Sequence, residues 1–491
     1  MNYNELKSGT DIRGIASDKG GNTVNLTENA VKDITAAFVF WLSKKLNKPG
    51  HELTISIGHD SRITANDIKA AALSQLLLAG VNVLDCSLSS TPAMFMTTVK
   101  ADCDAAIQIT ASHHPFDRNG LKFFTKNGGL DSPDIAEIVD LANVGTHLPI
   151  SDGKVTKIDF MNTYAEILRD IICTSLNKTA ESLPLKNYKI IVDAGNGAGG
   201  FYAENVLKPL GADITGSQFL EPDGMFPNHI PNPENKQAMQ SICAAVKNNK
   251  ADLGIIFDTD VDRAGCVDKN GNEINRNRLI ALAAIIAMQG NEGATIVTDS
   301  VTSDGLKKFI NCELGGKHYR YKRGYKNVIN KAIELCNQGI NCPLAIETSG
   351  HAALRENYFL DDGAYLATKI VVELAKGNDF DLLLKNLEMP AEEREIRLNI
   401  TTPDFKEYGN QVITKLQKFA EQKHDCIIAD DNREGIRITT PFGWMLLRLS
   451  VHDPVMPINF ESASVGGVQK TVDYFKEFFS TFKHLDLSSY K

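Results

Sequence analysis

Long apolar runs and paired cysteines are both missing from this chain of 491 residues. Its longest apolar stretches, 34–42 and 279–288, are shorter than the roughly 20 residues that a membrane helix needs, so no membrane partner is expected. The nine cysteines are odd in number and include no C-x-x-C pair, which argues against a disulfide framework. The first residues, MNYNELKSGTDIRG, have no apolar signal-peptide core. These absences predict a reduced, cytoplasmic protein.

An excess of basic residues is missing as well. The net charge is −9 at pH 7, whereas nucleic-acid binding depends on a basic face. One local exception is KHYRYKRGYK at 317–326, in which five cations alternate with three tyrosines. This segment could bind single-stranded RNA by charge and stacking, could be a solvated strand and loop, or could form a cationic wall of a phosphate site. We expect no nucleic-acid partner.

Several common catalytic and ligand-binding patterns are also absent. There is no G-x-S-x-G element, so acyl transfer is not favoured. The segment DAGNGAGG at 193–200 lacks a clean G-x-G-x-x-G and a Walker lysine, and its glycines indicate a tight turn that lets a helix pack closely on a strand. An EF-hand starting at Asp258 would need Gly and Glu where Arg263 and Lys269 stand, which excludes a calcium loop of that type.

What the chain does contain is a unit of strand, helix, strand, helix, strand that occurs three times. The first strands lie in 53–62, 188–200 and 293–303, the second in 80–92, 211–224 and 316–326, and the third in 103–115, 251–263 and 342–351. This alternation predicts α/β domains with largely parallel sheets. Ligands of such sheets bind beyond the carboxyl ends of the strands.

The repeat and the chain length together predict four domains, 1–155, 156–272, 273–392 and 393–491. The first three are expected to be similar, mixed, largely parallel α/β domains. The last contains short segments such as EIRLNITT, GIRITT and WMLLRLS separated by turns, together with helices near 404–419 and 468–482. This pattern predicts a smaller α+β domain with an antiparallel sheet and helices on one side.

A polar loop follows the third strand of each repeat. The three loops carry Ser112 with His113, then Asp258, Asp260, Asp262 and Arg263, then Glu347, Ser349 and His351. The clustered carboxylates offer hard oxygen ligands that suit Mg²⁺, although a solvated acidic turn is the alternative. Ser112 can be a structural turn serine, but its neighbours His113 and Lys122 favour a phosphate function. Arg13 lies either in an entry loop or close to the same site.

With these residues in view, the chain resembles the α-D-phosphohexomutase family over essentially its whole length. This family contains phosphomannomutases, phosphoglucomutases and phosphoglucosamine mutases. The segment TASHHP resembles the family's phosphoserine loop, DTDVDR its metal loop, ETSGH its sugar-specificity loop and LRLSVHDP its distal phosphate loop.

The resemblance implies a set of site residues. It makes Ser112, Asp258, Asp260 and Asp262 ligands of Mg²⁺, and it makes Ser112, His113, Arg13 and Lys122 the catalytic residues. The substrate-binding residues that follow from it are Arg263, Lys322, Arg323, Glu347, Ser349, His351, Arg448 and Ser450. The implied activity interconverts the 1-phosphate and 6-phosphate of mannose, glucose or both, through a phosphoserine and a hexose bisphosphate that also acts as activator. The partners are thus small sugar phosphates, and the oligomeric state is not indicated.

The sequence departs from the family pattern at three places. One is KRGY at 322–325, where small residues are commoner and where Lys322 or Arg323 can supply charge that the last domain lacks. Val451, His452 and Asp453 stand where small polar residues are usual, and His114 replaces the usual asparagine. A carboxylate facing a phosphate dianion would repel it, so Asp453 is expected either to point away and brace the loop or to mark an altered distal site. Three other functions stay open: a phosphoglucosamine mutase, an Asp258 aspartyl nucleophile of the haloacid type, and a non-catalytic sugar-phosphate sensor.

Overall fold

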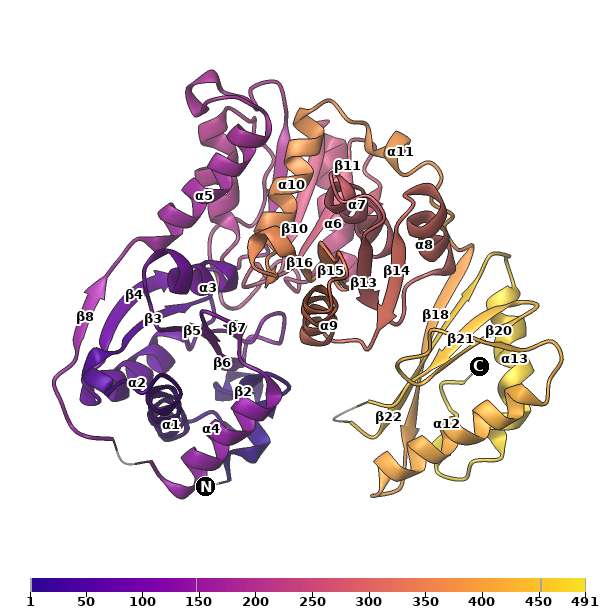
Figure 1. Cartoon of the computed structure of the whole chain (residues 1–491), viewed down its shortest axis with the longest axis horizontal. Helices are drawn as coiled ribbons and strands as arrows, with labels where there is room; N and C mark the ends of the chain where they lie inside the picture. Colours follow the sequence, from indigo (N-terminus) through magenta and orange to yellow (C-terminus); the bar gives the residue numbers. More distant parts are fainter. Residues whose placement is uncertain (1, 147, 451–452, 491) are drawn as a thin grey trace. The chain divides into compact units, whose positions relative to one another are not determined.

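The computed structural model describes residues 2–146, 148–450 and 453–490 (Figure 1). The chain divides into two units. Unit 1 contains Met1–Ile286 and Ser349–Leu383, and unit 2 contains Ala287–Thr348 and Leu384–Lys491. Within the described ranges, no helix has both the length and the apolar character that a membrane crossing requires.

The N-terminal sheet of unit 1 is mixed. Its strands are β1 (Lys7–Ser8), β2 (Asp11–Ile15), β3 (Thr54–His59), β4 (Asn82–Leu88), β5 (Ala105–Ile109), β6 (Arg118–Thr125), β7 (Gly128–Gly129) and β8 (Lys154–Lys157), in the order β1-β2-β6-β5-β3-β4-β8 with β7 beside β6. Strand β3 runs parallel to β4 and β5, and β6 runs antiparallel to β5. Because β3 and β5 are parallel neighbours, the loops that follow them meet at one edge of the sheet.

Four helices cover this sheet. They are α1 (Glu28–Leu46), α2 (Ala65–Leu78), α3 (Thr91–Lys100) and α4 (Ser132–Val144). Helices α1, α2 and α4 lie on one face and α3 lies on the other (Figure 1). Helix α1 starts where the Thr27 hydroxyl accepts the N–H of Ala30, a standard N-cap, and it buries apolar residues at helical spacing. Its Phe38 ring stacks on Phe123 of β6, with ring centres 4.3 Å apart.

The second repeat forms a smaller mixed sheet. Its elements are β9 (Ile190–Asp193), β10 (Leu253–Phe257), β11 (Ala264–Asp268), β12 (Glu273–Ile274), α5 (Phe160–Ser175) and α6 (Lys236–Asn249), with sheet order β12-β11-β10-β9. The next helix, α7 (Asn277–Met288), lies in the stretch predicted as the third domain. The strand expected in 211–224 does not form. Only isolated bridges, Lys189 with Asp213 and Asp193 with Gln218, remain there. Positive φ angles at Gly216 (+101°) and Phe219 (+53°) interrupt the extended backbone that a ladder requires.

The third repeat is divided between the two units. In unit 2, β13 (Thr295–Asp299) runs parallel to β14 (Lys317–Tyr321) and β15 (Leu344–Ile346), next to α8 (Asp304–Lys308) and α9 (Tyr325–Asn337) in the chain. In unit 1, β16 (Ala352–Leu354) and β17 (Leu360–Asp361) form an antiparallel hairpin that precedes α10 (Gly363–Ala375) and α11 (Phe380–Leu383).

The C-terminal sheet is antiparallel throughout, as predicted. Its strands are β18 (Glu392–Ile400), β19 (Ile427–Ile428), β20 (Ile436–Thr440), β21 (Gly443–Leu447), β22 (Val455–Ser462) and β23 (Leu485–Asp486), in the order β19-β20-β21-β22-β18-β23. Helices α12 (Phe405–Glu421) and α13 (Gly467–Ser480) pack on one face (Figure 1).

Side chains along β20 and β21 point alternately to the two faces of the sheet, so only every second residue lies in the core of this domain. Ile438 and Met445 belong to the core formed with the two helices, whereas Arg437 and Trp444 take the opposite face. Arg437 stacks on the Trp444 ring, with its Cζ 3.5 Å from the ring centre, and its Nη2 donates to Asp304 Oδ1 at 2.9 Å. The sheet is thereby joined to the β13–α8 segment of unit 2.

The glycine-rich loop after β9 has almost no free space around it. A Cβ added at Gly197 would lie 2.5 Å from the carbonyl oxygen of Thr259, and one at Gly200 would lie 2.3 Å from that of Leu220. Gly195 also takes a left-handed conformation, with φ of +54°. This loop therefore packs directly on backbone at the end of β10, in agreement with the tight turn that its sequence indicates.

The substitution Gly197→Ala should lower the free energy of unfolding by about 1–3 kcal/mol, because its methyl group meets backbone that cannot rotate away. Urea unfolding followed by circular dichroism measures this loss. Gly129→Ala is the matched control, since its Cβ would make an ordinary contact at 3.5 Å to Phe124 Cε1. Equal losses in the two variants would contradict the packing argument.

Candidate active site

Ser112 lies three residues beyond the end of β5 and has an unusual backbone. Its φ is +50°, a left-handed conformation that serine rarely adopts, and only 3% of the residue is exposed. Its Oγ lies 3.1 Å from Asp258 Oδ2, and Arg263 Nη2 donates to it at 3.0 Å. The serine of the first repeat and the acidic loop of the second are thus together within unit 1.

The acidic triad Asp258, Asp260 and Asp262 follows β10 directly and is buried. One carboxylate oxygen of each residue lies within 4.8 Å of those of the other two. Asp260 Oδ1 and Asp262 Oδ1 are buried and accept no hydrogen bond from the described residues. Buried oxygens without partners are costly, and a set of hard carboxylate ligands is what a divalent cation prefers. The triad can therefore hold a metal ion.

Cations compensate this buried negative charge. Lys122 Nζ lies 2.5 Å from Asp262 Oδ2, and Arg263 Nε lies 3.1 Å from Asp258 Oδ2. Burial, followed by repulsion from Asp262, raises the pKa of Asp258 well above its usual value. Burial also opposes charge on Asp262, but Lys122, His351 and Arg263 outweigh it and lower the pKa of that carboxyl group.

The two histidines after Ser112 are neutral. Burial and the charge of Arg263 lower the pKa of His113 to about 2. Burial and the charge of Arg13 lower the pKa of His114 to about 3. The two rings stack with centres 5.2 Å apart, and Arg263 Nη2 lies 2.5 Å from His113 Nδ1. Because a guanidinium can only donate, His113 Nδ1 accepts, and its other ring nitrogen carries the proton.

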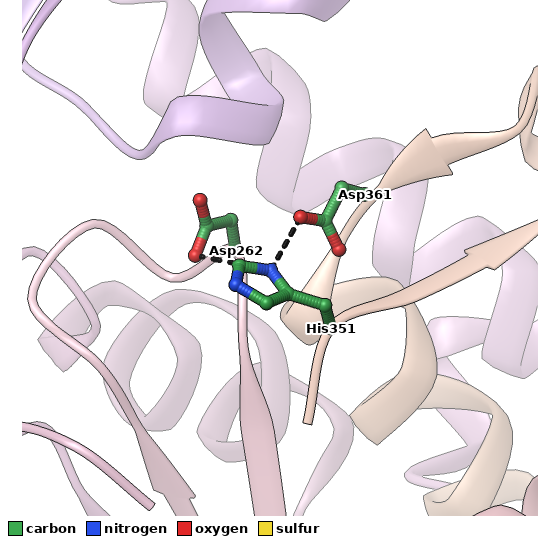
Figure 2. Close-up of side chains that lie close together, drawn as sticks. All are labelled: Asp262, His351 and Asp361. Atoms are coloured by element: carbon green, nitrogen blue, oxygen red, sulfur yellow. Dashed lines mark hydrogen bonds and ion pairs between the residues drawn. The ribbon is translucent and has the colours of Figure 1, made fainter. Parts of the chain in front are cut away.

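His351 forms a second charged cluster with two carboxylates. Figure 2 shows its ring between Asp361 and Asp262, with Nδ1 at 2.5 Å from Asp361 Oδ2 and 3.8 Å from Asp262 Oδ1. Burial opposes the charge on His351, but the two carboxylates raise its pKa to about 9. His351 is therefore a cation at neutral pH, and it adds positive charge beside the acidic triad.

The expected distal phosphate residues lie within unit 2. Arg448 Nη2 donates to Asn459 Oδ1 at 3.1 Å, and its Nη1 lies 4.0 Å from Glu434 Oε1. The other carboxylate oxygen of Glu434 accepts the backbone N–H of Arg323 at 3.2 Å. Arg323 and Arg448 thus both approach Glu434, and the charge of Arg323 acts with burial to lower the pKa of Arg448. Two neighbouring guanidinium groups are suited to an anion.

The other residues expected to bind substrate or to be catalytic are distributed over both units. Glu347 accepts the backbone N–H of Gly324 at 2.6 Å in unit 2, where Lys322 is exposed. Ser349 is buried and belongs to unit 1, because the boundary falls between residues 348 and 349. Arg13 is half-buried and pairs with Asp11 at 2.8 Å.

The altered distal loop is described only in part. Ser450 Oγ accepts the backbone N–H of Asp453 at 3.2 Å, and Asp453 is exposed. Val451 and His452 lie outside the described residues.

Several residues that the sequence analysis did not single out contact the predicted site residues. Thr91 Oγ1 donates to Asp260 Oδ2 at 2.5 Å, and Asp361 pairs with His351. Arg62 donates to backbone carbonyls of the Ser112 loop. A usable signal exists for Arg62, because GHDSR ends the strand β3 and the carboxyl ends of parallel strands converge.

A buried serine, an acidic triad and several cations at the ends of α/β strands are groups suited to phosphoryl transfer. Family models described as phosphoglucomutase/phosphomannomutase, alpha/beta/alpha domains I, II and III match residues 5–146, 163–271 and 275–389. A phosphoglucomutase from Neisseria gonorrhoeae is 30% identical over 480 residues, covering 97% of this chain and 96% of that protein. The chain belongs to the phosphoglucomutase/phosphomannomutase family.

Further relatives extend this likeness to structure. A phosphomannomutase/phosphoglucomutase from Pseudomonas syringae pv. tomato is 29% identical over 469 residues, covering 94% of this chain and 92% of that protein. The crystal structure of a phosphoglucomutase/phosphomannomutase family protein from Burkholderia thailandensis superposes with a TM-score of 0.79 at 26% identity, covering 98% of each chain. The fold is shared more widely, since the Paramecium phosphoglucomutase parafusin superposes with a TM-score of 0.73 at 16% identity, over 96% of this chain and 94% of that one.

The substitution Asp361→Asn should lower the pKa of His351 substantially from about 9, because it removes the nearest attracting charge. Titration of the histidine Cε1–H signals by NMR measures the shift. A folded pKa above the unfolded value of about 6.5 means that the pair stabilises fully below pH about 6.5 and that this contribution is lost as pH rises towards 9. Unfolding free energies of the variant should therefore vary less over that range. An unshifted His351 resonance would contradict the assignment.

Proposed function

We propose that this chain is a phosphohexomutase that interconverts hexose 1-phosphate and hexose 6-phosphate, with mannose, glucose or both as the sugar. The phosphoryl group is carried by Ser112. One observation carries this proposal: Ser112 Oγ, buried in a left-handed turn, lies 3.1 Å from a carboxylate of the acidic triad. The names of the relatives, phosphoglucomutase and phosphomannomutase, support the same activity.

Mg²⁺ is the proposed metal, with Asp258, Asp260, Asp262 and an oxygen of phosphorylated Ser112 as ligands. The buried carboxylate oxygens without hydrogen bonds support this choice. When bound, the ion neutralises charge on the phosphoryl oxygens. Lys122 and Arg263 supply fixed positive charge at the same place, because both already contact the triad.

The proposed transfer moves one phosphoryl group and one proton. The bond from phosphorus to Ser112 Oγ breaks, and a bond from phosphorus to the sugar hydroxyl oxygen forms. The hydroxyl proton ends on Ser112 Oγ. His113 Nδ1 lies 3.3 Å from that oxygen and accepts from Arg263, so the proposed role of His113 is to hold the Arg263 guanidinium beside the transferring group. The product is a hexose bisphosphate. The same compound, supplied as activator, returns a phosphoryl group to Ser112.

The remaining roles follow the family resemblance. Arg13 and His351 add positive charge near the transferring group, and Glu347, Ser349 and His351 bind sugar hydroxyls. The distal phosphate is assigned to Lys322, Arg323, Arg448 and Ser450, and the proximity of Arg323 and Arg448 at Glu434 supports this assignment. The domains proposed for these roles are 1–155, 156–272, 273–392 and 393–491.

The other functions are less well supported. An aspartyl phosphate at Asp258 would form on a carboxylate that Ser112 and Arg263 already contact. The names of the relatives do not favour a phosphoglucosamine mutase or a non-catalytic sensor. In the basic segment 317–326, Arg320 is only 4% exposed and its guanidinium pairs with Asp304 and Asp431, so it offers little to an RNA ligand.

The substitution Ser112→Ala should abolish uptake of phosphate from ³²P-labelled glucose 1,6-bisphosphate, because no other residue is proposed to carry it. Label on the unsubstituted protein should resist hydroxylamine, as a serine ester does and an acyl phosphate does not. Ser74→Ala is the matched control, since the Ser74 hydroxyl donates to the carbonyl of Ala71 within α2. Label on Ser112→Ala, or release by hydroxylamine, would refute the assignment.

The substitution Asp260→Asn should weaken Mg²⁺ binding at least tenfold in isothermal titration calorimetry, because it removes a negatively charged ligand while keeping the volume. Asp102→Asn is the control, since the Asp102 side chain is fully exposed and far from the triad in the chain. Affinities that agree for the two variants would show that the triad is not the metal site.

A further inference from the structure

We propose that Asp60, Arg62 and Thr110 form a positioning network that fixes the left-handed backbone of Ser112 and thereby aims its hydroxyl group. The inference rests on the proposed function, because it assigns these residues to the aim of a phosphoryl carrier. None of the three touches the reacting oxygen. They act through the backbone of the loop.

The Arg62 guanidinium donates hydrogen bonds to four backbone carbonyl groups in and next to the Ser112 loop. Its Nη1 donates to the carbonyl oxygens of Pro115 at 2.7 Å and Arg118 at 2.8 Å. Its Nη2 donates to the carbonyl oxygen of His114 at 2.6 Å and also to that of Ser112. A planar guanidinium can bind four carbonyls at once, whereas the ammonium of a lysine cannot reproduce this fork.

Thr110 holds the backbone N–H of Ser112, on the other side of its Cα. Its Oγ1 accepts the backbone N–H of Ser112 at 2.8 Å and donates to Asp60 Oδ2 at 2.6 Å. Asp60 in turn accepts the backbone N–H of Arg62 at 2.9 Å, and its Oδ2 lies 3.4 Å from Arg62 Nε. The network is therefore closed: both the N–H and the C=O of Ser112 are held by groups that Asp60 connects.

The network offsets the conformational free energy of the left-handed backbone at Ser112. A left-handed conformation at a residue other than glycine costs about 1–2 kcal/mol, and it persists only where the surroundings determine it. Ser112 cannot be replaced by glycine without losing the hydroxyl, so the surroundings must supply what the residue type does not. The hydrogen bonds from Thr110 and Arg62 meet this requirement.

Burial and a neighbouring loop exclude solvent from the network. The side chains of Arg62 and Asp60 are completely buried. The ring of Phe226, from the second repeat, lies 5.4 Å from Arg62 Cζ, and a Cβ at Gly224 would come within 2.4 Å of the Ser61 carbonyl oxygen. Arg62 is thus a positioning residue, because both of its Nη groups donate to backbone carbonyls and its side chain is completely buried.

The test compares Thr110→Val with Thr110→Ser, and Arg62→Lys with Arg169→Lys. Thr110→Ser keeps the hydroxyl that Thr110→Val removes. Arg169 is the control arginine, because it also donates to a backbone carbonyl, that of Asn205, outside the Ser112 loop. Amide hydrogen exchange of a peptide spanning 110–118 reports the loop directly. Steady-state kinetics and intact-mass measurement of phosphoserine report its consequence.

We expect Thr110→Val and Arg62→Lys to speed amide hydrogen exchange in 110–118 by tenfold or more. Both should also lower kcat by about 100-fold, because small misplacements of reacting groups have effects of this size. KM should change less than about threefold. Thr110→Ser and Arg169→Lys should resemble the unsubstituted protein in all three measurements. Unchanged exchange in both loop variants would overturn the proposal, as would a rise in KM at constant kcat. The exchange comparison stands even if the unsubstituted protein fails to convert hexose phosphates, an outcome that would refute the proposed function alone.

Discussion

The site depends on one electrostatic constraint: three carboxylates are buried within 4.8 Å of one another. Such a cluster is tolerated only where positive charge is fixed close by. Lys122 from β6, Arg263 from the triad's own loop and protonated His351 each provide it. Lys122 and His351 come from other segments of unit 1 than the acidic loop, so part of the neutralising charge is present only when those segments are packed together.

Strand topology explains how those segments meet. The parallel pair β3 and β5 delivers Asp60 and Arg62 to the same edge as Thr110 and Ser112. Strand β6, antiparallel to β5, returns Lys122 to this region, and the end of β10 supplies the triad. The glycine loop after β9 then closes on Thr259 without side chains between them. The strand order and the close packing of backbone thus set the positions of the reactive groups, which are the side chains of residues at or just beyond the strand ends.

Sequence reasoning found the groups that carry recognisable local patterns and missed those whose roles depend on partners elsewhere in the chain. Ser112 and the aspartates stand in polar loops after apolar strands, so their placement was predictable. Asp361 and Arg62 were not found, because their roles depend on partners 10 and 50 to 56 residues away in the chain. The helices and the antiparallel C-terminal sheet were predictable from periodicity. The missing strand in 211–224 was not, since left-handed residues such as Phe219 leave no clear mark in the sequence.

The stacking of Arg437 on Trp444 has a mechanical consequence. Together with the bond from Arg437 to Asp304, it binds the C-terminal sheet to the segment that continues β13. Arg448 extends from the strand β21, which contains Trp444, and Glu347 follows β15, the neighbour of β13. Arg448, proposed for the distal phosphate, and Glu347, proposed for the sugar ring, therefore both belong to unit 2, on elements that the Arg437 contacts join. With these proposed roles, the site would select ligands by the distance between phosphate and sugar ring as well as by hydroxyl pattern.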